Sequence, residues 1–250
     1  MSGHSKWHSI KHKKGAADAK RGKIFTKHAK LITIAARDGG DDPEMNPGLR
    51  TAIANAKADN VPNANIEKAI IKGAGGSGET SALSESMYEG FGPAGVALYV
   101  QTVTDNKNRA VSSIKNAFSK NGGNMGEAGC TAWMFEKKGL IFADIDGKNH
   151  DEAELEAIDA GAEDIDADGS TFEITTNPAQ LMKVRELLAN AGFSVEQATL
   201  SYVPKNTVKI NNADDAKKVL KLVEALEDED DVTNVYSNFD IPSDIIEKIS

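Results

Sequence analysis

Residues 140–202 read LIFADIDGKNHDEAELEAIDAGAEDIDADGSTFEITTNPAQLMKVRELLANAGFSVEQATLSY. Asp168-Gly169 is a turn signal between two short strands, so these strands are predicted to form a hairpin. The whole stretch predicts the order β-α-β-β-α-β, which is typical of a ferredoxin-like domain. The expected elements are strand 140–145, helix 151–160, strands 164–167 and 171–176, helix 178–191 and strand 194–202.

A similar set of elements flanks this stretch on both sides. The expected elements are strand 96–104, helix 109–120, strand 131–135, strand 207–210, helix 213–226 and strand 232–239. The elements before the stretch give β-α-β, and those after it give a second β-α-β. The sequence therefore predicts one ferredoxin-like domain inserted into another. The expected class is a multidomain α+β protein. Its expected parts are a basic helical domain at 1–77, a discontinuous outer α/β domain at 82–136 plus 205–240, and an inserted domain at 137–204.

The first 72 residues have a helical pattern. Apolar residues from Ile24 to Ala35 recur at spacings of three and four, and Asn46-Pro47 is a good cap and first-turn pair for the next helix. A third helix is predicted to end at Gly73. The following GAGGSGETS, residues 73–81, is typical of a flexible linker, and it has no Gly-Lys-Ser/Thr that would indicate a phosphate-binding loop.

Charge divides the chain unequally. Residues 1–37 hold ten Lys and Arg against one acid, Asp18, a net charge of +9. Because the whole chain carries −9, residues 38–250 carry −18. This split favours a basic arm for an anionic polymer, joined to an acidic body.

Composition excludes several classes of protein. The 40% hydrophobic content is that of a globular protein, and no apolar run approaches the ~20 residues of a membrane span. No secretory signal is visible, and a mitochondrial transit peptide is a weak alternative because the segment is rich in Lys rather than Arg. The single cysteine, Cys130, excludes an internal disulfide framework and fits a reducing cytoplasm. We expect a cytoplasmic protein without a membrane partner.

A basic stripe is the first candidate binding surface. Its cations share one side of the expected helix, opposite Phe25, His28 and Ile32, and are spaced three, four, three and seven residues apart. They are Lys20, Lys23, Lys27, Lys30 and Arg37, and Arg21 adds to the same segment. A solvated surface would give the same periodicity, but a basic face with almost no acids favours contact with a phosphate backbone.

The extreme N-terminus adds a second cluster of candidates. They are His4, Lys6, Trp7, Lys11, His12, Lys13 and Lys14. Trp7 among cations is suited to stacking on a base, although packing against the helical domain is an equal alternative. His4, His8 and His12 would form a row on a helix, but without a Cys or carboxylate partner they do not favour a metal site.

Two further charged segments have alternative interpretations. TDNKNR at 104–109 lies where a strand passes into a helix, so an Asn or Asp of this segment is expected to cap the helix, while Lys107 and Arg109 could form an anion pocket with the helix N-terminus. The acidic run 227–231 is expected to be a solvated loop, with Mg²⁺ or a basic partner as alternatives. No catalytic constellation can be defended from spacing, so we expect a non-enzyme that needs no cofactor, metal or small-molecule substrate.

Several collinear motifs resemble those of the YebC/PmpR family. They are GHSKW at 3–7, AKRGKIFTK at 19–27, NPGLRTAI at 46–53, YEGFGPAGVAL at 88–98, TDNKNR at 104–109, GGNMG at 122–126 and EDEDDVTNVYSN at 227–238. The resemblance covers essentially the whole chain. It implies a three-domain cytoplasmic protein labelled as a DNA-binding transcriptional regulator. It also implies kinship with a mitochondrial translational activator of cytochrome oxidase and with factors that act on the ribosome at proline runs.

Two functions from different classes therefore remain open. One is a DNA-binding regulator of transcription, for which the sequence shows no helix-turn-helix or other base-reading module. The other is a translation factor that binds ribosomal RNA or the ribosome, which suits a Lys- and His-rich arm with one Trp. A metal-dependent nuclease is a remote third interpretation.

Overall fold

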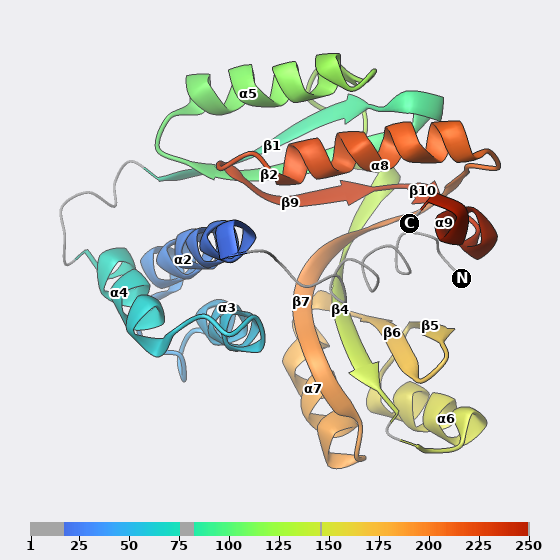
Figure 1. The fold of residues 1–250 in the computed structure, drawn as a ribbon. Coiled ribbons are helices and arrows are strands. Elements are labelled where there is room, and N and C mark those ends of the chain that lie inside the picture. The colour runs from blue at the N-terminus through green and yellow to red at the C-terminus, as the bar shows by residue number, and fades with distance from the viewer. Residues whose placement is uncertain (1–17, 76–82, 146, 250) are drawn as a thin grey trace. The chain divides into compact units, whose positions relative to one another are not determined.

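The computed structural model describes residues 18–75, 83–145 and 147–249 (Figure 1). These residues form two compact units. One unit contains residues 28–75 and 137–202, and the other contains 18–27, 83–136 and 203–249. A helical N-terminal region is followed by domains of sheet and helix, so the predicted mixed α+β class is confirmed.

From residue 18 onward, the described N-terminal region contains the helices α2 (Asp18–Gly39), α3 (Pro47–Ala58) and α4 (Asn63–Gly73). Asn46 caps α3 as predicted, because its side-chain oxygen accepts from the Leu49 amide at 3.0 Å. The Asn46 amide group also donates to the carbonyls of Ala35 and Gly40 at 2.8 and 2.7 Å. One buried side chain therefore satisfies backbone groups at the end of α2 and at the start of α3.

Gly73 belongs to the packed helices and not to a linker. It is the last residue of α4 and is buried, and a Cβ built on it would lie 2.4 Å from the Thr33 carbonyl oxygen and 2.6 Å from the Ala36 Cβ. Only a glycine allows α4 to approach α2 this closely. The linker predicted over 73–81 is therefore wrong at Gly73, and residues 76–82 lie outside the described part of the chain.

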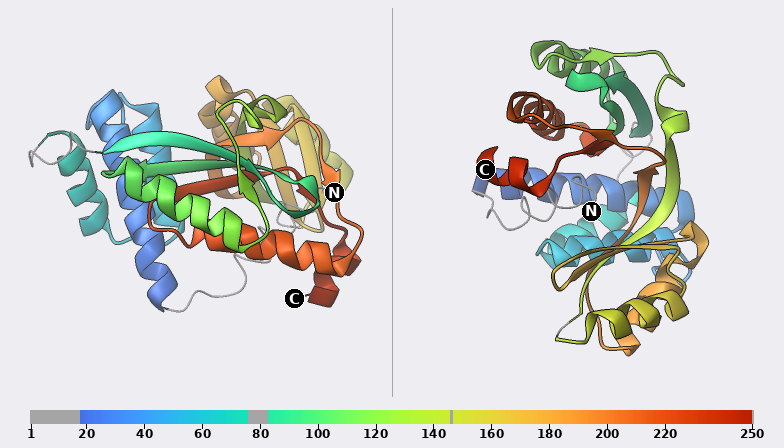
Figure 2. Two further views of the ribbon diagram at one scale, coloured as in Figure 1. Left: turned by 90° about the horizontal axis from the view of Figure 1, so that it is seen from above. Right: turned by 90° about the vertical axis from the view of Figure 1, so that its right-hand side faces the viewer.

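The segment that the sequence predicts as an inserted domain has the predicted β-α-β-β-α-β order. Its elements are β4 (Phe135–Asp144), α6 (His150–Ala160), β5 (Asp164–Asp168), β6 (Thr171–Thr176), α7 (Leu181–Asn190) and β7 (Ser194–Pro204). The strands are arranged β5-β6-β4-β7, and β6 is antiparallel to both of its neighbours. Both helices lie alongside each other in Figure 2 and bury Ala153, Val184 and Leu188 in a core with Ile141 and Phe172.

The outer domain contains a second four-stranded sheet. Its first part is β1 (Ser84–Phe91), β2 (Ala97–Thr104), α5 (Lys107–Lys120) and β3 (Asn124–Met125). Its second part is β8 (Val208–Lys209), α8 (Ala213–Glu227), β9 (Val232–Ser237), β10 (Phe239–Asp240) and α9 (Ser243–Ile249). The sheet order is β3-β1-β2-β9, and α5 and α8 pack side by side (Figure 2). Phe118, Leu222 and Leu226 form part of their shared core with Leu98.

Three expectations for the outer domain were wrong. Strand β1 was missed, although it forms an eight-residue antiparallel hairpin with β2. The predicted strand 131–135 is a 3-10 turn at Ala132–Met134, and only Phe135 belongs to a strand, the start of β4. The predicted strand 207–210 does not join the main sheet, because β8 pairs in parallel with β10 as a separate two-stranded sheet.

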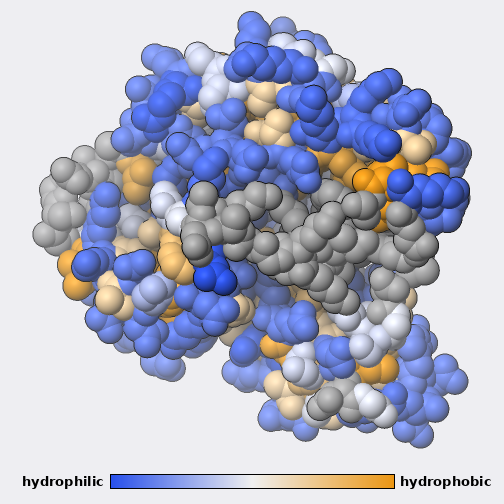
Figure 3. All heavy atoms as spheres, in the orientation of Figure 1, coloured by the Kyte–Doolittle hydropathy of each residue, from blue (hydrophilic) through white to orange (hydrophobic). Residues whose placement is uncertain are grey.

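The outward faces of α5 and α8 are mainly hydrophilic (Figure 3). This follows from their sequences, because the buried positions of α8 recur three or four residues apart and the Lys and Glu residues lie between them. Among the described residues, no helix combines the length and the apolar character that crossing a bilayer requires.

Candidate nucleic-acid interface

The predicted cations divide into those that the structure describes and those that it does not. His4, Lys6, Trp7, Lys11, His12, Lys13 and Lys14 lie outside the described residues. The other N-terminal candidates all lie on α2: Lys20, Arg21, Lys23, Lys27, Lys30 and Arg37. Arg21, Lys23 and Arg37 are exposed, whereas Lys27 and Lys30 are half-buried. The stripe is therefore only partly exposed to solvent.

Two lysines of α2 contact the C-terminal end of α8 within their unit. The Lys23 ammonium donates to the Asp228 carbonyl at 2.8 Å, and the Lys27 ammonium donates to the Glu227 carbonyl. These carbonyls have no partner inside the helix, and the negative end of the helix dipole favours cations there. The acidic run is therefore not simply a solvated loop.

His28 lies on the packed side of α2, as predicted. Its Nε2 atom is 2.6 Å from the Asp59 Oδ2 atom, and its side chain is mostly buried. This contact joins α2 to the end of α3, so we assign His28 a structural role.

Arg109 of the TDNKNR segment forms an ion pair with Asp231. Asn106 caps α5 as predicted, accepting from the Arg109 amide at 3.1 Å. The Arg109 guanidinium donates to both carboxylate oxygens of Asp231 and, at 2.7 Å, to Asp105. Hydrogen bonds from Arg109 and its charge lower the pKa of Asp105. Two carboxylates of the chain itself, those of Asp105 and Asp231, thus contact the Arg109 guanidinium. Lys107 is exposed.

The sequence did not reveal the second feature of the outer domain, a loop built around Glu89. This carboxylate is 8% exposed and accepts from the backbone amides of Gly129, Thr131 and Ala132 at 2.7, 2.6 and 2.7 Å. Burial alone would raise the pKa of Glu89, but these hydrogen bonds outweigh burial and lower it. A carboxylate dedicated to one loop fixes the conformation of residues 129–132.

Trp133 follows this fixed segment and is 63% exposed. Its indole N–H donates to the Cys130 carbonyl at 3.2 Å. The Lys205 ammonium donates to the Trp133 carbonyl at 3.1 Å, and the Lys205 amide donates to the Met134 carbonyl at 2.8 Å. The sequence signals this feature only by a Trp in the segment 131–135, which the pattern predicts to be a strand.

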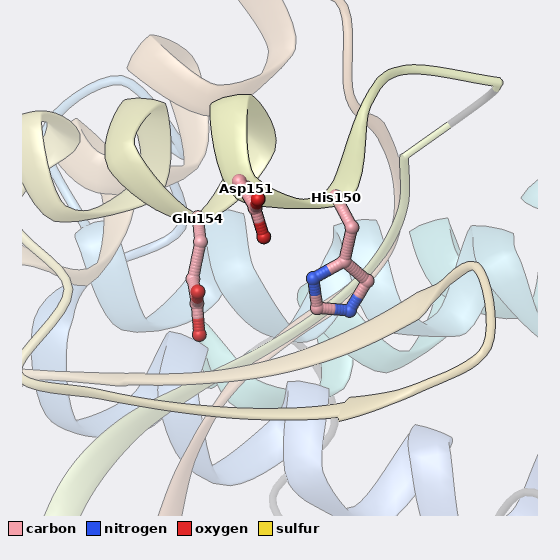
Figure 4. A group of neighbouring side chains, drawn as sticks. All are labelled: His150, Asp151 and Glu154. Atoms are coloured by element: carbon pink, nitrogen blue, oxygen red, sulfur yellow. The ribbon is translucent and has the colours of Figure 1, made fainter.

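His150, Asp151 and Glu154 form a separate group at the start of α6. Each offers one ligand atom, and these atoms lie within 4.8 Å of one another on one side of the helix (Figure 4). The N-terminus of a helix carries a positive partial charge, which disfavours a cation there. Packing also positions His150, because its ring and that of Phe172 make an edge-type contact with their centroids 5.0 Å apart. We therefore assign no metal to this group.

An open groove lies between α3 and α4. Its volume is about 530 Å³, and its lining includes Ile53, Ile66, Arg50 and Lys57. Arg50 and Lys57 are seven residues apart on α3, so they lie on the same side of the helix. The lining combines apolar side chains with these two cations and the carboxylate of Glu67.

Comparison with known proteins agrees with this architecture of a helical N-terminal region followed by sheet domains. Residues 5–76 match the family model described as the TACO1/YebC protein N-terminal domain, and residues 83–239 match that of the TACO1/YebC second and third domain. The chain belongs to the TACO1/YebC family, which confirms the resemblance seen in the sequence motifs.

Individual relatives support the same assignment. A protein of Halothermothrix orenii is 50% identical over 100% of this chain and 99% of its own length. One of Syntrophus aciditrophicus is 52% identical over the whole of both chains. Both are named "Probable transcriptional regulatory protein". The crystal structure of a conserved hypothetical protein from Aquifex aeolicus is similar with a TM-score of 0.83 and 45% identity, covering 90% of this chain and 93% of that one.

Proposed function

We propose that this chain is a cytoplasmic, non-enzymatic regulator of gene expression that binds nucleic acid through its N-terminal basic segment, residues 1–37. The observation that carries the proposal is the separation of charge. The segment has a net charge of +9, whereas residues 82–250 hold 30 acids against 15 Lys and Arg. The regulatory label of the relatives supports the same class of function.

A cationic segment of this kind binds phosphates by releasing counterions, so its affinity depends on salt. If about six phosphates are contacted, log K falls with log salt with a slope of about −4 on single strands and about −5 on duplex. The measurement is the affinity of the full chain for a fluorescently labelled nucleic acid between 0.05 and 0.3 M salt.

Matched variants locate the binding surface. Changing Lys20, Arg21 and Lys23 to Gln removes three cations of α2, and the slope should become shallower by about two to three. Changing Lys217, Lys218 and Lys221 to Gln removes three cations from α8 and should leave the slope unchanged. The opposite result, with the α2 variant binding like the wild type, would exclude the start of α2 from the interface.

A ribosomal RNA target is favoured over duplex DNA by the charge of the body. Residues 82–250 carry a net charge of −15, which repels an extended duplex lying across them. A short cationic segment attached to an acidic body suits structured RNA, which is recognised by shape and by stacking on unpaired bases. Binding to promoter DNA is the second candidate, because the relatives are named probable transcriptional regulatory proteins.

A further inference from the structure

We infer that Trp133 is a stacking platform for one unpaired nucleobase of RNA, held ready by Glu89. This inference rests on the proposed nucleic-acid binding and adds a second contact, on the outer domain, to the basic segment. The observation behind it is the unusually large exposed surface of the Trp133 side chain. Large aromatic side chains are usually well buried, and this one leaves 63% of its surface in water.

The loop that carries Trp133 is built to hold one conformation. Glu89 receives three backbone hydrogen bonds from Gly129, Thr131 and Ala132, and the Thr131 hydroxyl donates to the Leu98 carbonyl at 3.0 Å. A buried carboxylate is costly unless it is fully hydrogen-bonded, so its presence here is explained by the loop that it organises. A rigid platform loses little conformational entropy when a ligand binds.

The indole ring is itself tied to this loop. Its N–H already donates to the Cys130 carbonyl, so its polar edge needs no partner from outside. What the side chain still offers is its flat π surface. Lys205 brings a cation to the same place, and only one of the three donors of its ammonium contacts the Trp133 carbonyl.

The size of the exposed surface argues for a base and against a protein partner. Among the described residues of this unit, Phe91 at 36% and Trp133 are the only large apolar side chains with high exposure. A stable protein interface needs about 800 Å² on each partner, with an apolar centre. A single ring matches one nucleobase, and base–aromatic stacking is the usual means of binding single strands.

Charge contributes little to this contact, because the exposed acids Glu127 and Glu136 equal in number the exposed cations Lys137 and Lys205. Replacing Trp133 should therefore change affinity without changing the salt slope, whereas replacing cations of α2 changes both. This difference separates the stacking contact from the basic segment.

The test uses the full chain and a single-stranded 12-nucleotide RNA of mixed sequence at about 0.15 M salt. Trp133→Leu should weaken binding roughly 5- to 150-fold with an unchanged salt slope, and Trp133→Phe should retain most of the affinity. Phe91→Leu is the matched control for loss of an exposed aromatic and should bind like the wild type. The same RNA annealed to its complement should show a smaller effect of Trp133→Leu, since stacking needs an unpaired base.

Fluorescence gives a direct reading of the ring. The chain has two tryptophans, so a Trp7→Phe chain reports Trp133 alone, and its own affinity is measured alongside. RNA should quench this emission until it saturates. Half of the quenching should occur at the RNA concentration at which half of the protein is bound. Unchanged emission together with unchanged affinity of Trp133→Leu would overturn the inference and leave the proposed function intact. A response to whole ribosomes but not to protein-free ribosomal RNA would overturn it in favour of a protein contact. Failure of the wild-type chain to bind any nucleic acid would overturn the proposed function and this inference with it.

Discussion

Arg109 holds Asp231 in a two-pronged ion pair across the outer domain. The Arg109 Nε and Nη2 atoms donate to the two carboxylate oxygens of Asp231 at 2.9 and 3.0 Å. The Asp231 side chain is 6% exposed and that of Arg109 is 53% exposed. The Asp231 carbonyl also accepts from the Val103 amide at 2.9 Å. This pair therefore fastens the start of α5 to the turn that enters β9.

Arg109→Ala should destabilise the outer domain. The change leaves the buried Asp231 carboxylate without its strongest partner, and we expect a loss of about 1–3 kcal/mol in the free energy of unfolding. Lys107→Ala, two residues away on an exposed position, is the control and should change stability by less than about 0.5 kcal/mol. Urea unfolding followed by circular dichroism measures both. Equal stability of the two variants would show that the ion pair contributes nothing.

Two glycines of the helical region should respond in opposite directions to the same change. Gly73→Ala forces a methyl group against the Thr33 carbonyl and should cost about 1–3 kcal/mol. Gly22→Ala on α2 meets no atom within 4 Å, and should stabilise the helix by about 0.5–1 kcal/mol. Thermal unfolding of the two variants checks this pair. A neutral Gly73→Ala would mean that α2 and α4 separate without cost.

Glu89 should make the loop of Trp133 sensitive to acid. Because the folded-state pKa of Glu89 lies below its ordinary value of 4.5, the charged form stabilises the fold. This contribution is complete above pH 4.5 and is lost as the pH falls through the lowered pKa. Glu89→Gln should therefore be less stable than the wild type at pH 7, and the difference should narrow below about pH 4. A difference that stays constant from pH 7 to pH 3 would contradict this.

Local sequence patterns predicted the parts of the fold that local forces determine. The β-α-β-β-α-β order of residues 140–202, the cap at Asn46 and the cap at Asn106 all follow from turn and capping residues that act within a few positions. The strand at 84–91 was missed although Gly92-Pro93 is a turn signal, because that turn was not taken as the link of a hairpin with β2.

Long-range contacts account for what could not be predicted. Asp231 looked like part of a solvated acidic run, and only the approach of Arg109, 122 residues earlier, makes it a buried partner. In the same way, nothing near Glu89 in sequence indicates that it will bind a loop 40 residues later. The platform at Trp133 depends on that contact, so neither the 3-10 turn nor the exposure of the ring was foreseen.

We propose that the basic segment binds nucleic acid and prefers RNA to duplex DNA. The most direct measurement is a competition titration with the full chain bound to a labelled promoter fragment. The two competitors are protein-free ribosomal RNA and random duplex DNA, compared at equal phosphate concentration and about 0.15 M salt. We predict that the RNA displaces the fragment at a lower concentration than the duplex does. If the promoter fragment is preferred by about 10³ or more over random DNA, the range reached by specific regulators, and RNA does not displace it, the RNA account is wrong and the chain is a DNA-binding regulator.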